Sequence, residues 1–330
     1  MRVGVIGVGR MGKVHAATLA SLPDVKVAIT DADGKRAREV AEELGVEVAP
    51  GTEELIASSE AVVVAAATDA HAALIHSAAD AGVPVFCEKP IAVDLESTAE
   101  VVAHVERSGV AFQMGFQRRF DRGYLAAREL VRGGGLGTLY VVRMAGHDPA
   151  PPPEAYIPVS GGIFRDFGVH DFDALRFVTG QEVSSVYAEG GVVGFPVFAK
   201  YRDVDAAAVV LRLSGGAFGV LTATRHDPLG YDVRMELIGS GDSVAVGWDG
   251  RTPLRSLEPG AGPAPEDPYR DFQDRFKDAY RAEIAYFLDV AAARRESPCT
   301  AKDALAALRI AVACDLSRAG GRPVSLQEIP

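Results

Sequence analysis

The chain has 330 residues, a length that predicts two domains. Of these residues 48% are hydrophobic and 24% are charged, which is the composition of a folded globular protein. The 34 basic and 45 acidic residues give a net charge of −11, which disfavours binding to a nucleic-acid backbone. Three cysteines, Cys87, Cys299 and Cys314, lack the spacing of a zinc site, so we expect no metal and reduced thiols in the cytoplasm. No apolar run approaches the roughly 20 residues that span a bilayer, so we expect no membrane partner.

The first 120 residues alternate short apolar segments with helical segments. Strands are expected at 3–6, 25–30, 61–65, 84–87 and 111–114, and helices at 13–21, 34–44, 70–81 and 95–108. Strands that are apolar on both faces and are separated by helices are typical of a parallel sheet covered by helices. The sequence therefore predicts a doubly wound α/β domain over residues 1–120.

The remaining residues, 121–330, show a different order of elements. Strands are expected at 139–145, 183–189, 206–213, 217–224, 233–238 and 243–246, and helices at 121–132, 167–179, 269–293 and 302–317. Two proline-rich stretches, 148–158 and 258–268, are interpreted as surface loops. Consecutive strands without crossover helices predict an α+β domain with an open, mainly antiparallel sheet, and its last helices can pack back on the first domain.

A GxGxxG motif, Gly7-Val8-Gly9-Arg10-Met11-Gly12, lies between the first expected strand and the first expected helix. In this motif the first glycine allows a tight turn, the second lets a pyrophosphate approach the backbone, and the third lets the helix pack on the strand. The context on both sides of the motif predicts a Rossmann domain that binds a dinucleotide.

Asp31 follows the second expected strand, 19 residues after Gly12. A carboxylate at this place accepts hydrogen bonds from the adenosine ribose and repels a 2′-phosphate, which favours NAD over NADP. Lys35 and Arg36 keep NADP open as the alternative, since a nearby cation can accommodate a phosphate.

The segment Glu88-Lys89-Pro90 follows the strand at 84–87, where an open parallel sheet places its ligands. Further along the chain, Asp166 and His170 are four residues apart and would share one face of a helix. Oxidation of a carbinol needs a base that titrates near neutral pH and a cation that stabilises the alkoxide, which the imidazole and the lysine can supply. The structural alternatives are a surface lysine, an aspartate that caps a helix and a histidine satisfied within its helix.

Together these residues resemble the glucose-fructose oxidoreductase, inositol dehydrogenase and rhizopine catabolism (Gfo/Idh/MocA) family. The resemblance is carried by the glycine motif, by Glu88-Lys89-Pro90, and by Gly161-Gly162 followed by Asp166, His170 and Asp173. It covers essentially the whole chain, and the segment 115–121 further resembles the inositol 2-dehydrogenase branch.

The resemblance implies a role for each matching residue. Lys89, Asp166 and His170 would form the catalytic triad, with His170 as the acid/base, and a cis proline would follow Lys89. The implied cofactor contacts are Gly7, Gly9, Arg10, Met11, Gly12, Asp31, Thr68, His71, Glu88 and Lys89. The implied substrate contacts are Lys89, Gln117, Arg118, His147, Asp166, His170 and Tyr231.

The chain also departs from the family pattern. Ala66-Ala67 replaces a frequent Thr-Pro pair before Thr68, and Gln117 and the proline-rich stretch at 148–158 differ at the border of the expected pocket. The predicted activity is NAD-dependent oxidation of a ring hydroxyl of a cyclic polyol or sugar, with myo-inositol or scyllo-inositol favoured. The alternatives are a redox-neutral enzyme that uses NAD on a sugar, and a non-catalytic NAD-binding regulatory protein.

Six expected strands with only three helices among or after them would leave one face of the second sheet uncovered. An uncovered apolar face usually marks a protein interface. The sequence therefore predicts a homo-oligomer, a dimer or tetramer, built on the second domain.

Overall fold

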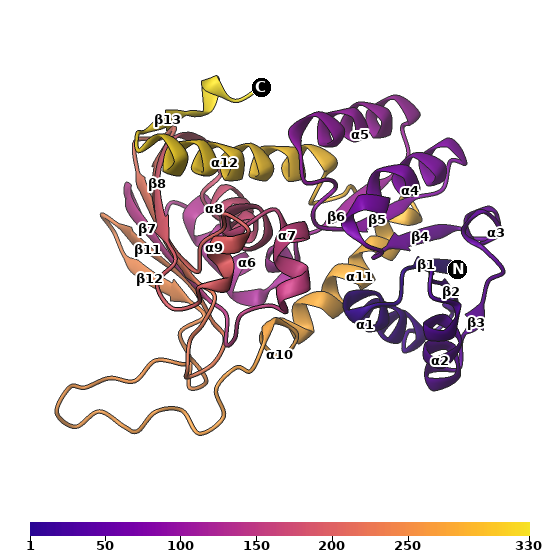
Figure 1. Ribbon diagram of the computed structural model, residues 1–330, viewed down its shortest axis with the longest axis horizontal. Helices are drawn as coiled ribbons and strands as arrows, with labels where there is room; N and C mark the ends of the chain where they lie inside the picture. The colour runs from indigo at the N-terminus through magenta and orange to yellow at the C-terminus, as the bar shows by residue number, and fades with distance from the viewer. The chain divides into compact units, whose positions relative to one another are not determined.

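The computed structural model describes residues 1–330 and divides into two compact units (Figure 1). Unit 1 comprises residues 1–120 and 278–306. Unit 2 comprises residues 121–277 and 307–330. Each unit therefore combines one long stretch of the chain with a shorter stretch near the C-terminal end, residues 278–306 in unit 1 and 307–330 in unit 2.

Unit 1 contains a six-stranded sheet in the order β3-β2-β1-β4-β5-β6, and all of its strand pairs are parallel. The strands are β1 (Arg2–Ile6), β2 (Lys26–Thr30), β3 (Glu47–Val48), β4 (Ala61–Val64), β5 (Val85–Glu88) and β6 (Phe112–Gly115). The helices are α1 (Arg10–Ala20), α2 (Gly34–Leu44), α3 (Thr52–Ala57), α4 (Thr68–Asp80), α5 (Leu95–Ser108), the 3₁₀ turn η1 (Gln117–Phe120) and α11 (Lys277–Ala291). This strand order is that of the Rossmann fold, which confirms the predicted doubly wound sheet.

Two short elements of unit 1 were not predicted from the sequence. β3 has two residues, both exposed, and α3 has six residues. Segments this short show neither the alternation of a strand nor the apolar period of a helix, so the hydrophobic pattern gave no signal.

The core of unit 1 joins segments from both parts of the chain. Val5, Ile29 and Phe86 from the sheet belong to one buried cluster with Ile284 and Phe287 of α11. Polar contacts tie the same segments together: the Gln113 side-chain amide donates to the Glu283 carbonyl at 3.0 Å. Burial of large apolar side chains contributes about 1.5–3 kcal/mol each, so α11 is an integral part of unit 1.

Unit 2 contains a seven-stranded sheet in the order β12-β11-β7-β10-β9-β8-β13. Its strands are β7 (Leu139–His147), β8 (Val183–Gly191), β9 (Ala206–Leu213), β10 (Phe218–Thr224), β11 (Asp232–Gly239), β12 (Ser243–Val246) and β13 (Val324–Ser325). Its helices are α6 (Arg122–Arg132), α7 (Ile157–Ser160), α8 (Val169–Thr179), α9 (Val197–Lys200), α10 (Phe272–Arg275) and the main part of α12 (Ala301–Gly320), with short turns η2 (Glu154–Tyr156), η3 (Phe164–Gly168) and η4 (Leu326–Glu328). Only β7 and β10 pair in parallel, so the predicted mainly antiparallel sheet is confirmed.

Three predictions for unit 2 need correction. The proline-rich stretch 148–158 is not wholly a loop, because η2 and α7 occupy its second half, and proline is tolerated at the start of a helix. The single helix expected at 269–293 is two helices, because the Asp271 side chain caps α10 and the buried Phe276 separates it from α11. The helix expected at 167–179 begins earlier, with the π-helical turn η3.

Alternation along the strands gives the sheet of unit 2 a buried face and an outer face. Phe218, Val210 and Tyr187 are 41%, 46% and 39% exposed on the outer face. The register places Val220 opposite Val210, and Val210 opposite Tyr187, so these side chains form one row across β10, β9 and β8. We call this row and Phe218 the outer apolar patch.

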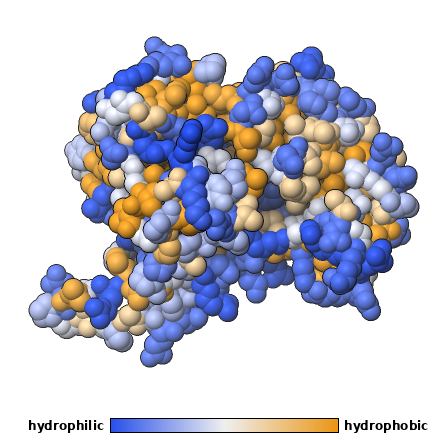
Figure 2. All heavy atoms as spheres, viewed as in Figure 1, coloured by the Kyte–Doolittle hydropathy of each residue, from blue (hydrophilic) through white to orange (hydrophobic).

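A long loop between β12 and α10 extends away from the sheet of unit 2 (Figure 1). Figure 2 shows both hydrophilic and hydrophobic residues on it, and Leu257 is 83% exposed there. Arg251 anchors the base of the loop through Asp274, at 2.9 Å. None of the helices in the structure has the length and apolar character required to cross a membrane.

Candidate active site

The glycine motif of unit 1 forms the turn between β1 and α1. Gly7 has a φ of +85°, and a Cβ at this position would lie 2.5 Å from the Ala66 Cα. A Cβ on Gly12 would lie 1.8 Å from the Gly7 carbonyl oxygen, whereas one on Gly9 would meet nothing within 4 Å. Thus Gly7 and Gly12 permit close packing, and Gly9 leaves open space in front of the backbone.

The N-terminus of α1 fits a dinucleotide pyrophosphate. Gly9 is its N-cap, no side chain caps the helix, and no acidic residue lies in its first turn. Helix N-termini of this kind bind anions through backbone N–H groups and the helix dipole. Arg10 and Met11 stand in that first turn, next to the open space at Gly9.

Asp31 lies directly after β2, and its side chain is only 6% exposed. Its carboxylate accepts hydrogen bonds from the backbone N–H groups of Val8 and Asp33, both at 2.8 Å. Arg36 lies 3.5 Å from the same carboxylate and 3.5 Å from the Asp33 carboxylate. Asp31 is therefore fixed beside the glycine turn, as a ribose ligand must be, and Arg36 is already shared between two carboxylates.

The segment that contains Lys89 follows β5 at the same edge of the sheet. The Lys89–Pro90 peptide bond is cis, as the resemblance implied. Two buried histidines contact this segment: His15 lies 2.6 Å from the Glu88 carboxylate, and His71 lies 2.8 Å from the Pro90 carbonyl oxygen. Thr68, the first residue of α4, also lies at this edge of the sheet.

The structure thus brings all of the predicted cofactor residues to the carboxyl edge of one parallel sheet. Gln117 and Arg118 follow β6 at this edge in η1, and both are buried. Ligands of doubly wound sheets bind at this edge. The contacts of the individual residues with a cofactor or substrate stay predictions.

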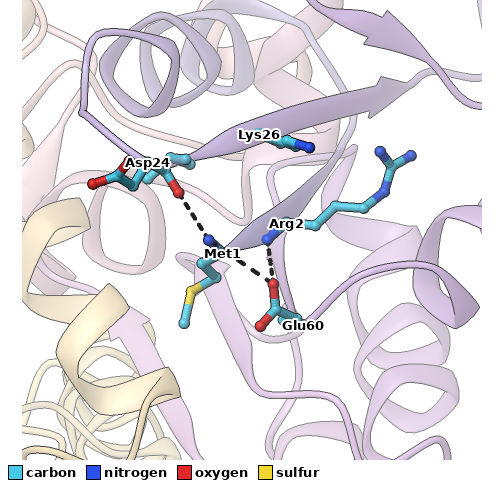
Figure 3. A pocket seen from close by; sticks show the side chains of 6 residues that line it. Met1, Arg2, Asp24, Lys26 and Glu60 are labelled. Atoms are coloured by element: carbon cyan, nitrogen blue, oxygen red, sulfur yellow. Dashed lines mark hydrogen bonds and ion pairs between the residues drawn. The ribbon is translucent and has the colours of Figure 1, made fainter.

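A pocket of about 510 Å³ lies at the opposite edge of unit 1, where β1, β2 and β4 begin (Figure 3). The terminal amine of Met1 donates to the Asp24 carbonyl at 2.8 Å, and the Arg2 backbone N–H donates to Glu60 at 2.5 Å. These groups satisfy one another, and none of the predicted cofactor residues lines the pocket. It is therefore not part of the cofactor site.

In unit 2, Asp166 lies in the π-helical turn η3 and His170 in the first turn of α8. The four-residue spacing between them therefore passes through a π turn and not through a regular α-helix. Such turns are frequent at functional sites because they change the direction in which side chains point. Asp173, one turn further along α8, is buried.

The Asp166 carboxylate has two partners that the sequence analysis did not identify. The Tyr156 hydroxyl donates to one carboxylate oxygen and the Arg225 guanidinium to the other, each at 2.9 Å. Arg225 is 3% exposed and also lies 3.4 Å from Asp148. Burial by itself lowers the pKa of Arg225, but Asp166 and Asp148 together raise it above its usual value, so the buried arginine stays charged.

His147 extends this polar network at the end of β7. Its Nδ1 lies 2.8 Å from the Thr224 hydroxyl, which itself donates to the His226 carbonyl. Because the hydroxyl proton is used in that second bond, His147 Nδ1 is the donor and Nε2 is the acceptor of the neutral ring. Burial lowers the pKa of His147, although Asp232 and Asp227 oppose this effect.

Tyr231 precedes β11, which pairs with β7 so that Asp232 stands opposite His147. The Tyr231 side chain is 5% exposed, and its ring packs edge-on against Phe276. Unit 2 therefore collects Asp166, His147 and Tyr231 around the ends of β7 and β10 and the start of β11.

The residues missed by sequence reasoning gave weak signals. Tyr156 and Asp148 lie in the proline-rich stretch that was interpreted as a loop. Arg225 directly follows the apolar strand β10, and this position of a charged residue was the only feature of the sequence that could have indicated a role for it. His15 belongs to no motif and to no metal-ligand spacing in the sequence, and the structure contains no group of three potential metal ligands.

Comparison with known proteins agrees with this architecture. Residues 1–116 match the family model described as "Oxidoreductase family, NAD-binding Rossmann fold", and residues 124–245 match the "GFO/IDH/MocA C-terminal domain". The chain is 39% identical to the myo-inositol dehydrogenase Hyg17 of Streptomyces leeuwenhoekii, over 97% of this chain and 98% of that protein.

Solved structures show the same similarity. A probable dehydrogenase from Thermotoga maritima is 36% identical, with all of both chains covered and a TM-score of 0.94. The scyllo-inositol dehydrogenase from Lactobacillus casei with bound NAD(H) and scyllo-inositol is 28% identical over 99% of each chain, with a TM-score of 0.89. The chain therefore belongs to the Gfo/Idh/MocA family of NAD-binding Rossmann-fold oxidoreductases.

Proposed function

We propose that this oxidoreductase is an NAD-dependent dehydrogenase that oxidises one ring hydroxyl of myo-inositol or scyllo-inositol. The observation that carries the substrate class is the polar network that the buried Arg225 and the partly buried Asp166, His147 and Thr224 form in unit 2. A polyol presents a hydroxyl on each ring carbon, and each hydroxyl both donates and accepts a hydrogen bond. A site with fixed carboxylate acceptors and an imidazole acceptor suits such a ligand.

Relatives support the same substrate class. Full-length relatives at 37% and 34% identity are a myo-inositol 2-dehydrogenase of Thermotoga maritima and an NAD-dependent scyllo-inositol 2-dehydrogenase of Bacillus subtilis. Both names describe oxidation at one carbon of an inositol ring, so the reaction proposed here is common to both.

NAD, when bound, supplies the acceptor for the hydride. We assign the proton to His170, which takes it from the reacting hydroxyl as general base. The Lys89 ammonium stabilises the negative charge that develops on the oxygen, and Asp166 balances and orients the His170 imidazole. Arg225 and Tyr156 hold the Asp166 carboxylate in one orientation, at 2.9 Å each.

The preference for NAD follows from Asp31. Its carboxylate is fixed by two backbone N–H groups, and its two oxygens remain acceptors for ribose hydroxyls. A 2′-phosphate at this place would face a fixed negative charge.

The test is an activity panel. Purified protein is incubated with NAD or NADP and with inositols, aldoses and anhydrosugars, and reduction of the cofactor is followed at 340 nm. The proposal expects turnover with NAD and at least one inositol. Turnover of an anhydrosugar without net NADH would instead support the redox-neutral alternative, and a flat panel together with NAD binding would support a regulatory protein.

The division of roles is tested with single variants. Lys89→Met should lower kcat by about 10²-fold, in the range for removal of a preorganised donor. His170→Ala should flatten the rise of the oxidation rate with pH and leave NAD affinity nearly intact. A His170→Ala enzyme with the parental kcat and pH profile would remove the histidine from the mechanism.

We also propose that the protein forms a homo-oligomer through the outer apolar patch of unit 2. Val210 and Tyr187 lie opposite each other in one row of the sheet, and Phe218 lies outside that row on the neighbouring strand. Their exposed apolar surface is unfavourable in water and is typical of an interface. Light scattering tests this proposal, and a monomer mass at every protein concentration would contradict it.

A further inference from the structure

Two buried histidines of unit 1 lie at the two ends of the Glu88–Pro90 segment. His15, on α1, is 0% exposed and contacts the Glu88 side chain, and His71, on α4, is 2% exposed and contacts the Pro90 backbone. Buried polar groups require partners, because an unsatisfied one costs about 1–3 kcal/mol. Here both imidazoles use those bonds on the segment that carries Lys89.

Aromatic packing holds the His15 ring in addition to its hydrogen bond with Glu88. It packs edge-on against Phe86 with ring centroids 5.2 Å apart, and against Tyr280 at 6.1 Å. An ionised carboxylate has no proton to give, so Nε2 of His15 is the donor in the 2.6 Å contact with Glu88. The glycine motif and the Lys89 segment are thereby joined, because His15 lies on α1, the helix whose N-cap is Gly9.

His71 contacts two backbone carbonyls at once. Its Nδ1 lies 2.8 Å from the Pro90 oxygen, and its Nε2 lies 3.0 Å from the Ala66 oxygen. Carbonyl oxygens only accept hydrogen bonds, so a neutral imidazole, which has one N–H, donates to one of the two, and a ring protonated on both nitrogens donates to both. His71 therefore lies between Pro90, the residue after the cis peptide bond, and Ala66, the residue that a Cβ on Gly7 would meet first.

We propose that His15 and His71 are positioning residues that hold the Glu88–Pro90 segment from both ends and so fix the place of Lys89. The proposal rests on the proposed function of Lys89 as the group that stabilises the alkoxide. Neither histidine needs to touch the substrate. A displacement of a catalytic group by about 1 Å costs up to roughly 10²-fold in rate, which sets the scale of the expected effect.

The two nitrogens of His71 allow a matched pair of variants. An asparagine amide can replace Nδ1 and keep the bond to Pro90, whereas a glutamine amide can replace Nε2 and keep the bond to Ala66. We expect kcat of His71→Gln to be about tenfold or more below kcat of His71→Asn, because only the asparagine keeps the bond to the segment that carries Lys89. For His15, where Nε2 is the donor, we expect His15→Gln to retain most of kcat and His15→Leu to lose it.

The controls separate positioning from general loss of stability. His104→Gln and His104→Leu remove another histidine of unit 1. His104 lies on α5 and pairs with Asp80 of α4 at 2.8 Å, and both variants should have the parental kcat. KM for NAD and the thermal midpoint are measured for every variant. Positioning predicts a fall in kcat with KM for NAD within about threefold, and equal kcat values for His71→Asn and His71→Gln would overturn the proposal.

A measurement without turnover separates this proposal from the proposed function. Lysines are dimethylated with ¹³C, and the Lys89 signal is assigned with Lys89→Arg. We expect His71→Gln and His15→Leu to shift that signal, and His71→Asn, His15→Gln and the His104 variants to leave it in place. If the protein oxidises no inositol but the signal behaves in this way, the substrate proposal fails and the positioning proposal stands. An unmoved Lys89 signal in His71→Gln and His15→Leu would overturn the positioning proposal whatever the activity.

Discussion

Replacement of Arg225 by methionine tests the buried centre of unit 2. The Arg225 side chain is 3% exposed and pairs with Asp166, which is 12% exposed, and with Asp148, which is 21% exposed. Methionine keeps most of the side-chain length and removes the charge, so two carboxylates lose their common cation. Removal of one partner from a buried pair costs about 3–5 kcal/mol, because the other charge stays buried without compensation.

The expected loss can be read from thermal and urea unfolding of unit 2. A loss of about 3 kcal/mol lowers the melting temperature by roughly 6–12 °C for a domain of this size. Trp248 is the single tryptophan and belongs to unit 2, so its fluorescence follows that unit, and circular dichroism follows the whole chain. We further expect kcat of the proposed oxidation to fall, since Asp166 loses the bond that orients one of its oxygens.

Two control variants test whether the loss of stability comes from the buried charge pair. Arg322→Met breaks a pair with Glu328 at 2.7 Å that is exposed on both sides, and should leave the melting temperature nearly unchanged. The double variant Arg225→Met/Asp166→Asn removes a charge from each side and should be less destabilised than the sum of its two single variants. An Arg225→Met protein within 1 kcal/mol of the parent would refute the assignment of Arg225 as the central cation.

The remaining predictions concern the cofactor, the pH response and assembly. Asp31→Ser should narrow or reverse the preference for NAD, measured as kcat/KM with NAD and NADP, and an unchanged ratio would exclude Asp31 as the ribose ligand. Burial lowers the pKa of His147 in the folded chain. Below the usual histidine pKa near 6.5, the unfolded chain therefore binds more protons than the folded chain, and the free energy of unfolding should fall as the pH falls below that value. His147→Asn keeps a donor to Thr224 and should reduce this pH dependence in urea unfolding at pH 5 to 7. Phe218→Asp should shift the light-scattering mass toward the monomer.

The helix bounds are predicted most accurately where capping residues define both ends of the helix. The bounds 34–44 and 95–108 agree with α2 and α5 in the structure. Asp33 and Asp94 cap the two N-termini by accepting backbone hydrogen bonds, and Gly45 and Gly109 end the helices in the left-handed conformation. Because capping depends on a few adjacent residues, the sequence alone contains this information.

The glycine motif is readable for the same reason. Its three glycines have distinct local tasks, and the structure shows them as a tight turn, an open approach and a close contact. The proline-rich stretch at 148–158 shows the opposite case. Its composition indicates a loop, but packing of Ile157 and Ser160, both buried, supports a short helix that composition does not predict.

The partners of the proposed site residues Asp166 and Glu88 could not be predicted, because they lie far from them along the chain. Arg225 is 59 residues from Asp166, and His15 is 73 residues from Glu88. No spacing rule links such pairs, since their approach depends on the order of strands in each sheet. β10 lies beside β7, which places Arg225 next to the residues that follow β7, and the carboxyl end of β5 faces α1 through His15. A motif thus identifies which side chains can do chemistry, and the topology determines which neighbours orient them. Residues such as Arg225 and His15, buried and charged or polar without a motif of their own, are therefore the places where the structure adds most to the mechanism.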